Sequence, residues 1–373
     1  MKLTLGQLRV LVEQLLIEEE EDKNKSQDDD QVPDELPDVS QGPTAMVAFL
    51  NSPAGQDPRV RELLKSGRKD GNKNDESAKI AETSPTVGSL VPTQREIELT
   101  KSIAYPLARF ESMKGYIGGG VHQVGPTPIV TSGNLIIDGH HRWSSLFSIT
   151  GPKGQIKAFD ISLPETDAAS VLAIVQAAIA TTLGTSPVPE AKAGSSNILG
   201  KGENEIYHLL EESAGESGEA GVILSDDYVL SCINDPEVSK YFGIGAKKQA
   251  KKDKNKNLNA ERRFMNGLLL FEKDKDNESS IRDAKRMIMS KVAKNLSLME
   301  QPAPGSPPRV DMPQLDQAGG GIKGVLKKLS SGDVNYKAPF SPNDKNKKQV
   351  ADGYRRNGVI IVERWQRLAG LLK

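Results

Sequence analysis

The chain has 373 residues, of which 36% are hydrophobic and 5% aromatic. This apolar share is lower than that of an ordinary globular protein, so it supports a buried core in part of the chain but not in all of it. The 49 Lys and Arg residues almost balance the 50 Asp and Glu residues, which excludes a strong overall field for nucleic acid or a membrane surface. The single cysteine, Cys232, excludes an intramolecular disulfide framework and a cysteine-based zinc site.

The first 91 residues are predicted to form a leader helix and a tether. Residues 1–21 place leucines near helical spacing and end in an acidic run, a pattern typical of an amphipathic helix. Residues 22–91 are rich in Asp, Asn, Lys, Ser, Gly and Pro, which predicts a disordered, low-complexity tether. Two short helix-like stretches interrupt it as docking segments, at 44–51 and 57–66. Because no apolar run reaches membrane-spanning length, we expect no membrane partner.

Residues 92–184 are predicted to form a compact α+β domain of ordinary size. Thr93 and Glu96 have the spacing of a capping box, which predicts a helix from this point to about Met113 with a bend at Pro106. The remaining pattern predicts, in chain order, a strand over 128–131, a turn over 132–134, a strand over 135–137, a helix reaching 149, a strand over 156–163 and a helix over 167–183.

The rest of the chain is predicted to be a helical region at 185–300, followed by a Pro-rich linker and a docking segment at 301–373. The candidate helices cover residues 203–212, 226–234, 237–242, 260–271 and 279–298. Between two of them, Lys247–Lys256 is basic, but its Asn and Asp residues and its lack of aromatics favour a solvated loop over a nucleic-acid contact. Pro302–Pro313 is predicted to be extended, and Val359–Lys373 to dock as a strand or an amphipathic helix.

The residues that indicate chemistry are Asp138–Arg142, the DGHHR motif, which follow an apolar strand and open a helix. Gly139 allows a tight turn or the close approach of a ligand, and unpaired N–H groups at the helix start favour an anion. Arg142 offers a bidentate fork to phosphate or carboxylate. His140 or His141 can transfer a proton or bond a phosphoryl oxygen. Asp138 can hold Mg²⁺, accept a hydroxyl proton or orient a histidine.

A purely structural interpretation of the motif is also open. In it Asp138 caps the helix, Gly139 adopts an unusual φ and the histidines fill a satisfied polar pocket. We favour a functional site, because five polar or conformationally special residues stand together after an apolar strand. His140 and His141 are adjacent and do not share a helix face, which argues against a simple two-histidine zinc site.

Two other histidines and a glycine run were weighed for a role. Gly118–Gly120 is predicted to be a flexible hinge, because it lacks the flanking Lys of a phosphate-binding loop. His122, just after it, is predicted to lie at the surface unless the loop folds over the motif. His208 is predicted to be structural or exposed.

The segment Thr127–Trp143 resembles the ParB/sulfiredoxin superfamily, above all its ParB-like nuclease branch with the same Asp-Gly-His-His-Arg sequence. The resemblance covers residues 96–184, about a quarter of the chain. It implies a small α+β domain in which the DGHHR motif forms a nucleotide-phosphate corner. The activities that it implies are ATP-dependent sulfinic acid reduction in sulfiredoxins, CTP hydrolysis and DNA clamping in ParB, and phosphoryl transfer in free serine kinases.

The sequence of this motif differs from that of two of the branches, and these differences reduce the number of activities that we expect. Sulfiredoxins carry Gly-Cys-His-Arg, and His140 stands at the position of that Cys, which argues against sulfinic acid reduction. ParB carries Gly-Glu-Arg-Arg together with a helix-turn-helix domain, for which the downstream sequence gives no clear pattern. Free serine kinases share the DGHHR motif, so the resemblance assigns Asp138 to their functional Asp and Glu111, by position alone, to their upstream Glu.

Two further segments look like parts of proteins from large tailed phages. They are the leader helix, beginning with Met1–Arg9, and the Pro-rich Arg309–Gln314. This resemblance implies a phage protein located in the host cytoplasm or in the virion. It also implies phage structural proteins as partners, bound through the terminal helices.

The function expected from these observations is a phosphate-handling domain protein of phage type that acts on a nucleotide or nucleic acid, as a nuclease, an NTPase or a kinase-like phosphotransferase. Asp138, His140 and His141 are the candidate catalytic residues. Gly139, His140, His141 and Arg142 are the candidate phosphate ligands, and Mg²⁺ held by Asp138 with a nucleotide is the candidate cofactor. The alternative is a non-enzymatic virion or assembly protein that keeps the domain as a scaffold or DNA-binding module.

Overall fold

The computed structural model describes residues 38–69, 77–183, 196–218, 220–245 and 277–336. The predicted leader helix, the first part of the tether, the basic loop, the helix at 260–271 and the C-terminal docking segment therefore lie outside the described residues. In the described parts, no helix is both long enough and apolar enough to cross a membrane.

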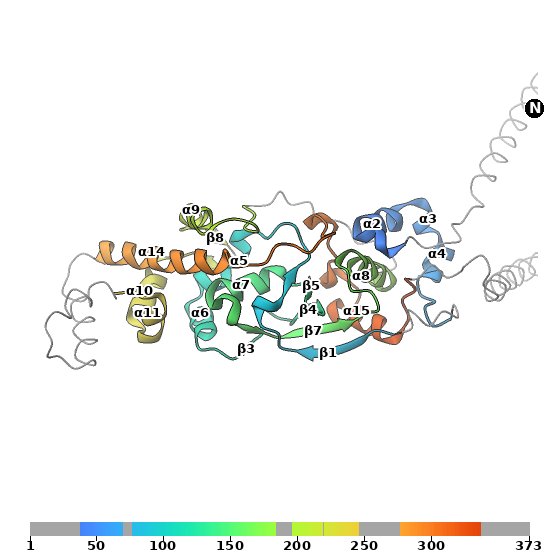
Figure 1. Cartoon of the computed structure of the whole chain (residues 1–373), viewed down its shortest axis with the longest axis horizontal. Helices are drawn as coiled ribbons and strands as arrows, with labels where there is room; N and C mark the ends of the chain where they lie inside the picture. The colour runs from blue at the N-terminus through green and yellow to red at the C-terminus, as the bar shows by residue number, and fades with distance from the viewer. Residues whose placement is uncertain (1–37, 70–76, 184–195, 219, 246–276, 337–373) are drawn as a thin grey trace, which may run out of the picture.

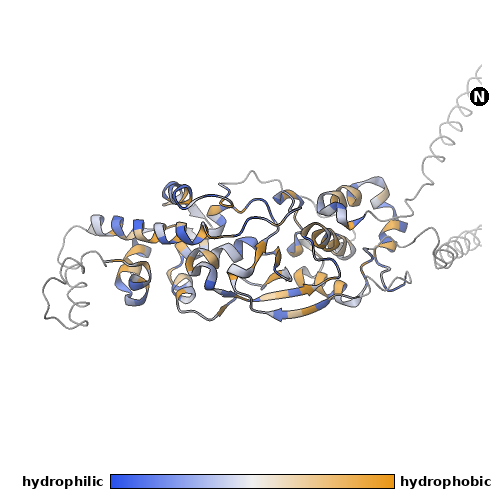
Figure 2. Ribbon diagram, in the orientation of Figure 1, coloured by the Kyte–Doolittle hydropathy of each residue, from blue (hydrophilic) through white to orange (hydrophobic). Residues whose placement is uncertain are grey.

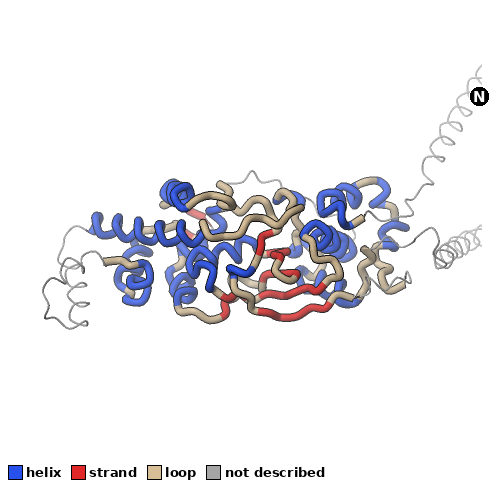
Figure 3. The backbone as a smooth tube through the Cα atoms, in the orientation of Figure 1, coloured by secondary structure: helices blue, strands red, loops and turns tan. Residues whose placement is uncertain are grey.

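A mixed five-stranded sheet lies at the centre of the protein (Figures 1 and 3). Its strands, in spatial order, are β1 (Lys79–Thr83), β7 (Ala158–Ser162), β4 (Ile129–Ser132), β5 (Leu135–Asp138) and β2 (Val91–Pro92). The strand β4 is antiparallel to β5 and parallel to β7, whereas β1 is antiparallel to β7 and β2 is parallel to β5. Together with the many helices, this sheet confirms the α+β fold class.

Alternate side chains of the central strands point to opposite faces of the sheet, and each face has its own hydrophobic core. Ile129 and Ile136 belong to the first core, whereas Val130 and Ile137 belong to the second. All four are at most 1% exposed. Figure 2 shows hydrophobic residues concentrated on these strands in the middle of the molecule. The central sheet is therefore buried on both faces, and the motif lies where its strand β5 ends.

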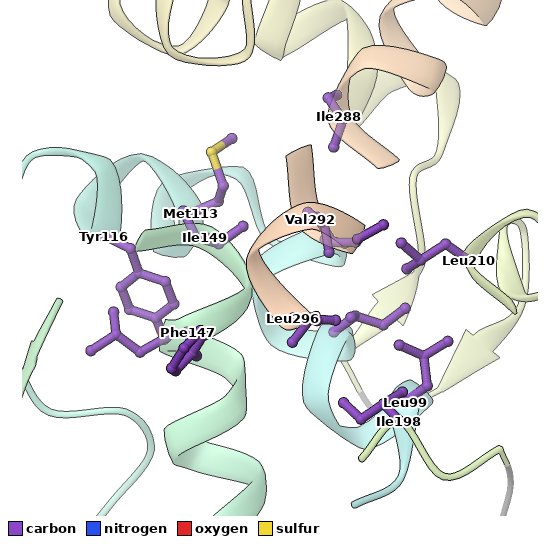
Figure 4. Close-up of a cluster of buried hydrophobic side chains, with 14 of the residues drawn as sticks. Leu99, Met113, Tyr116, Phe147, Ile149, Ile198, Leu210, Ile288, Val292 and Leu296 are labelled. Carbon is purple, nitrogen blue, oxygen red and sulfur yellow. The ribbon is translucent and has the colours of Figure 1, made fainter. Parts of the chain in front are cut away.

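Helices cover both faces. The first core is covered by α5 (Leu99–Ala108), α6 (Phe110–Ile117), α7 (His140–Thr150), α9 (Glu203–Ser213), α10 (Asp226–Asn234), α11 (Pro236–Phe242) and α14 (Asn277–Leu296). In Figure 4, Val292 and Leu296 of α14 lie between Ile149 of α7 and Leu210 of α9. The second core is covered by α2 (Gly42–Asn51), α4 (Pro58–Leu63), α8 (Ala168–Leu183) and α15 (Gly321–Ser331), and the short α3 (Pro53–Gln56) lies between α2 and α4 in the chain.

Two small strand pairs complete the structure. The strand β3 (Val121–His122) runs parallel to β6 (Gln155–Ile156), and β8 (Ser217–Gly218) pairs antiparallel with β9 (Gly221–Val222). The predicted strands and helix from 128 to 149, and the helix over 167–183, are confirmed as β4, β5, α7 and α8. The helices predicted at 203–212, 226–234, 237–242 and 279–298 are confirmed as α9, α10, α11 and α14.

The prediction of a disordered tether is wrong for residues 38–69 and 77–91, whereas the two helix-like docking segments predicted within it, at 44–51 and 57–66, are confirmed as α2 and α4. Helix α2 packs against α8, and its Met46 and Leu50 are at most 2% exposed. The strand β1 forms an edge of the sheet by pairing with β7. Met46 and Leu50 lie in a predicted docking segment, whereas the polar composition of the stretch gave no signal for β1.

The predicted helix over 93–113 is also wrong at its start. Val91–Pro92 forms β2, and the chain stays non-helical until α5 begins at Leu99. Thr93 is no N-cap, because its hydroxyl donates to the backbone oxygen of Ile136 in β5. Tertiary pairing with β5 therefore outweighs the local capping signal.

The Pro-rich segment predicted as a linker packs on the domain. Residues 302–318, which we call the strap, run from the end of α14 across the molecule to α15 (Figure 1). Met312, Leu315 and Ala318 of the strap belong to the second core and are at most 6% exposed. The strap therefore shares the core of the sheet domain, although about 120 residues separate it from α8 in sequence.

Candidate functional site

The DGHHR motif forms a sharp strand-to-helix turn. The strand β5 ends at Asp138, Gly139 follows with φ 94° and ψ 27°, and α7 begins at His140. A Cβ atom on Gly139 would lie 2.6 Å from Cγ2 of Ile129 and 2.9 Å from Nη2 of Arg142. Both the left-handed backbone and the lack of space therefore require glycine here.

The first turn of α7 has no side-chain cap, since its N-cap residue is Gly139. The first bond within the helix runs from the Trp143 N–H to the Gly139 oxygen, at 2.9 Å. The three preceding N–H groups, of residues 140–142, lack acceptors within the helix by the geometry of any α-helix. They carry the positive end of the helix dipole, which favours an anion at this end.

His140 is buried, at 4% exposure, and is the inner support of the turn. Its Nε2 accepts the backbone N–H of Thr93 at 3.0 Å. Burial lowers the pKa of His140 from 6.5 to about 3, with smaller contributions from His141 and Arg142. His140 is therefore neutral near pH 7, and a neutral ring whose Nε2 accepts carries its proton on Nδ1.

His141, the next residue of α7, contacts the same segment, residues 93–98, at its other end. Its Nε2 accepts the backbone N–H of Glu98 at 3.2 Å. Burial lowers its pKa to about 4, and the positive charges of Arg309 and Lys101 lower it further. The two histidines thus bind residues 93–98 to the first turn of α7. Their Nε2 lone pairs are used in this way and are not free to take a proton from a substrate.

The guanidinium of Arg142 holds the loop that precedes β4. Nη1 donates to the backbone oxygen and hydroxyl of Thr127, the latter at 2.6 Å, and to the backbone oxygen of Pro128 at 3.0 Å. Nη2 donates to Oδ2 of Asp138 at 2.6 Å. The fork predicted to bind phosphate is therefore engaged with the protein itself.

Asp138 is a quarter exposed and forms an ion pair with Arg142. Burial raises the pKa of its carboxyl, and the charge of Asp316 from the strap raises it further. The charge of Arg142 and the backbone N–H of Gly139 act in the opposite direction but do not cancel this rise. Asp138 is thus the group of the motif whose proton affinity has increased.

Metal binding by the protein alone does not fit these residues. In the part of the chain that the structure describes, no group of three or more His, Cys, Asp or Glu side chains is placed to hold a metal ion. The Asp138 carboxylate is already paired with Arg142. The prediction of Mg²⁺ brought by a nucleotide stays a prediction, and we assign the metal no step.

The sequence reasoning missed five residues that complete the corner. They are Thr93, Glu98, Lys101, Arg309 and Asp316. Arg309 and Asp316 belong to the strap. Nη1 of Arg309 lies 3.0 Å from Oε2 of Glu98, and Nζ of Lys101, a residue of α5, lies 3.4 Å from the same oxygen. Arg309 and Glu98 are 211 residues apart, so no local spacing could have predicted this contact.

The strap and the histidines hold residues 92–98 from two sides. The Ala303 N–H donates to the Pro92 oxygen at 2.9 Å, and the Arg95 N–H donates to the Pro307 oxygen at 3.3 Å. Behind the motif, Trp143 is fully buried and its Nε1 donates to the Val87 oxygen at 2.8 Å. These hydrogen bonds therefore tie the corner to the strap and to the segment before β2.

Other predicted candidates lie away from these contacts. Glu111 is exposed in the first turn of α6. His122 is half-buried against the ring of Tyr116, with centroids 5.4 Å apart, and burial lowers its pKa. His208, predicted to be structural or exposed, is exposed, and its Nδ1 lies 3.3 Å from Oε2 of Glu211.

A scan against protein-family models, a search of curated proteins and a search of solved structures each found no match to this chain. The ParB/sulfiredoxin resemblance therefore rests on the DGHHR motif and the segment around it. The functional argument rests on the geometry of the corner.

Proposed function

We propose that this protein is a phosphate-handling domain protein of the ParB/sulfiredoxin type, which binds the phosphate group of a nucleotide or of nucleic acid at the first turn of α7. The observation that carries the proposal is the uncapped start of α7 at Gly139. Three backbone N–H groups lack helical acceptors there, and an oxyanion is the ligand that satisfies them best.

The chemistry best supported at this corner uses Asp138 for proton transfer. Its raised pKa brings a carboxyl closer to the range in which it both accepts and releases a proton. Arg142, at 2.6 Å, fixes the orientation of this carboxyl. His140 and His141 act as positioning residues in this account, since both accept backbone N–H groups. A base of this kind beside a bound phosphate suits a nuclease, an NTPase or a phosphotransferase.

Isothermal titration with ATP and with a 5′-phosphorylated oligonucleotide tests the proposal, followed by turnover measurements on the same samples. We expect binding by the wild type and loss of turnover in both Asp138→Ala and Arg142→Ala, since Arg142 orients the Asp138 carboxyl. Lys323→Gln is the matched control, since Lys323 is an exposed residue of α15 outside the corner. Unchanged binding and turnover in both motif variants would refute the proposal.

A second candidate function is a non-enzymatic virion or assembly protein of a tailed phage. It is favoured by the observation that each polar side chain of the motif is engaged in a bond within the chain. Such a protein would keep the domain as a scaffold or DNA-binding module and would bind phage structural proteins through its terminal segments. Finding the protein in purified particles, with no heat on titration with ATP, supports this candidate over the first.

A further inference from the structure

We infer that Arg309 of the strap, together with Lys101, is the specificity-determining cation of the corner and directs the phosphate to the Glu98 side of α7. This inference rests on the proposed function, because it names the side chains that select the anion at that same site. Its ligand class is a phosphate ester or polyphosphate, a group with more than one negative charge.

The Arg142 side of the corner is unfavourable for an anion. Arg142 supplies one positive charge, but Asp138 lies 2.6 Å from it, and the charge of Asp316 acts on Asp138 from the strap. Two acidic groups thus face one basic group. The Arg142 donors are also engaged with Thr127 and Pro128, so a phosphate would have to displace the protein's own acceptors.

The Glu98 side has the opposite balance. Lys101 and Arg309 both approach Oε2 of Glu98, at 3.4 Å and 3.0 Å. Two basic groups therefore face one acidic group, and the Lys101 side chain is 42% exposed. Both cations are paired with Glu98, so an incoming anion shares them with that carboxylate, but it breaks no backbone hydrogen bond.

This positive side adjoins the first turn of α7. The backbone N–H of Glu98 lies 3.2 Å from Nε2 of His141, the second residue of the helix. The charges of Arg309 and Lys101 reach the His141 ring strongly enough to lower its pKa. The two cations thus lie beside the segment that His141 of α7 contacts, and we place the phosphate between them and the N–H groups of residues 140–142, which have no acceptor within the helix.

The strap does not depend on Arg309 for its position. Asp311 of the strap accepts a hydrogen bond from Nε2 of Gln176 at 3.0 Å through its backbone oxygen, and one from the Thr44 hydroxyl at 2.7 Å through its side chain. Met312 and Leu315 are buried in the second core. A change at Arg309 therefore removes the charge and leaves the strap in place.

Titration of the full chain with inorganic pyrophosphate tests this inference. We expect Arg309→Gln and Lys101→Gln each to weaken binding about tenfold, as for loss of one hydrogen bond to a charged group. Arg309→Lys should recover part of the affinity. The matched control is Lys323→Gln, which neutralises an exposed lysine on α15 and should change the affinity less than about twofold.

A further variant separates charge from structure. Thr44→Val removes an anchor of the strap but neither cation, so its affinity should equal that of the wild type. Equal losses in Thr44→Val and Arg309→Gln would overturn the inference, since Arg309 would then act only by holding the strap. Binding by the wild type that Arg309→Gln leaves unchanged would also overturn it, while the proposed function stands. If the wild type binds neither pyrophosphate nor ATP, the proposed function itself fails.

Discussion

Replacement of Gly139 by alanine probes the turn on which the whole corner depends. The residue has φ 94°, and an added Cβ would lie 2.6 Å from Cγ2 of Ile129, a side chain that is 1% exposed. The left-handed backbone costs a non-glycine residue about 1–2 kcal/mol. Relief of the clash by movement of the first core costs about 1–3 kcal/mol more. The substitution should therefore destabilise the protein by about 2–5 kcal/mol.

Gly119→Ala is the matched control for this substitution. Gly119 also has a positive φ, of 79°, but nothing lies within 4 Å of an added Cβ. Its replacement should therefore cost only the backbone contribution of about 1–2 kcal/mol. The difference between the two variants isolates the clash with Ile129.

Urea unfolding followed by tryptophan fluorescence measures both variants. Trp143 is fully buried four residues after Gly139, and Trp365→Phe leaves it as the only tryptophan. The midpoint should fall further in Gly139→Ala than in Gly119→Ala. Equal midpoints in the two variants would refute the reasoning that the motif glycine is required by packing as well as by its backbone angle.

Three further outcomes follow from the geometry of the corner. The pKa values of His140 and His141 are lowered from 6.5 to about 3 and about 4 in the folded protein, so the unfolded chain binds more protons below pH 6.5. The contribution of the two histidines to stability should thus be fully present above pH 6.5 and be lost as the pH drops toward 4. In urea midpoints measured at pH 7, 6 and 5, His140→Gln should show a smaller fall than the wild type. Parallel falls in the two proteins would contradict this prediction. Thr127→Val removes one acceptor of Arg142 and should speed amide hydrogen exchange in residues 123–128 about fivefold, with exchange in α8 unchanged. Trp143→Phe leaves the Val87 oxygen with only the longer bond from the Leu90 N–H, at 3.4 Å. It should cost about 2–4 kcal/mol by circular dichroism, whereas a cost below about 0.5 kcal/mol would exclude a structural role for the indole bond.

The strand-turn-helix around the motif was predictable because its signals are local. An apolar run, a two-strand hairpin and Gly139 stand next to one another in sequence, and β4, β5 and α7 form where expected. Helix α8 was predictable for a similar reason, since its apolar run is long and Asp167 accepts the Ser170 N–H at its start.

The roles of the motif side chains were not predictable from spacing. The acceptor positions of His140 and His141 are set by backbone groups 47 and 43 residues away. The cations beside Glu98 come partly from the strap, 211 residues away. These contacts depend on how segments of polar composition pack on the sheet, and composition alone predicts a tether and a linker there.

The central claim is that a phosphate group binds at the first turn of α7, and the backbone amides of residues 140–142 report on it most directly. Two-dimensional ¹H–¹⁵N NMR of the full chain during titration with pyrophosphate follows these amides individually. We predict that the largest chemical-shift changes occur at His140, His141 and Arg142, with those of Lys101 and Arg309 next. Binding that shifts amides elsewhere and leaves these three unchanged would contradict the account.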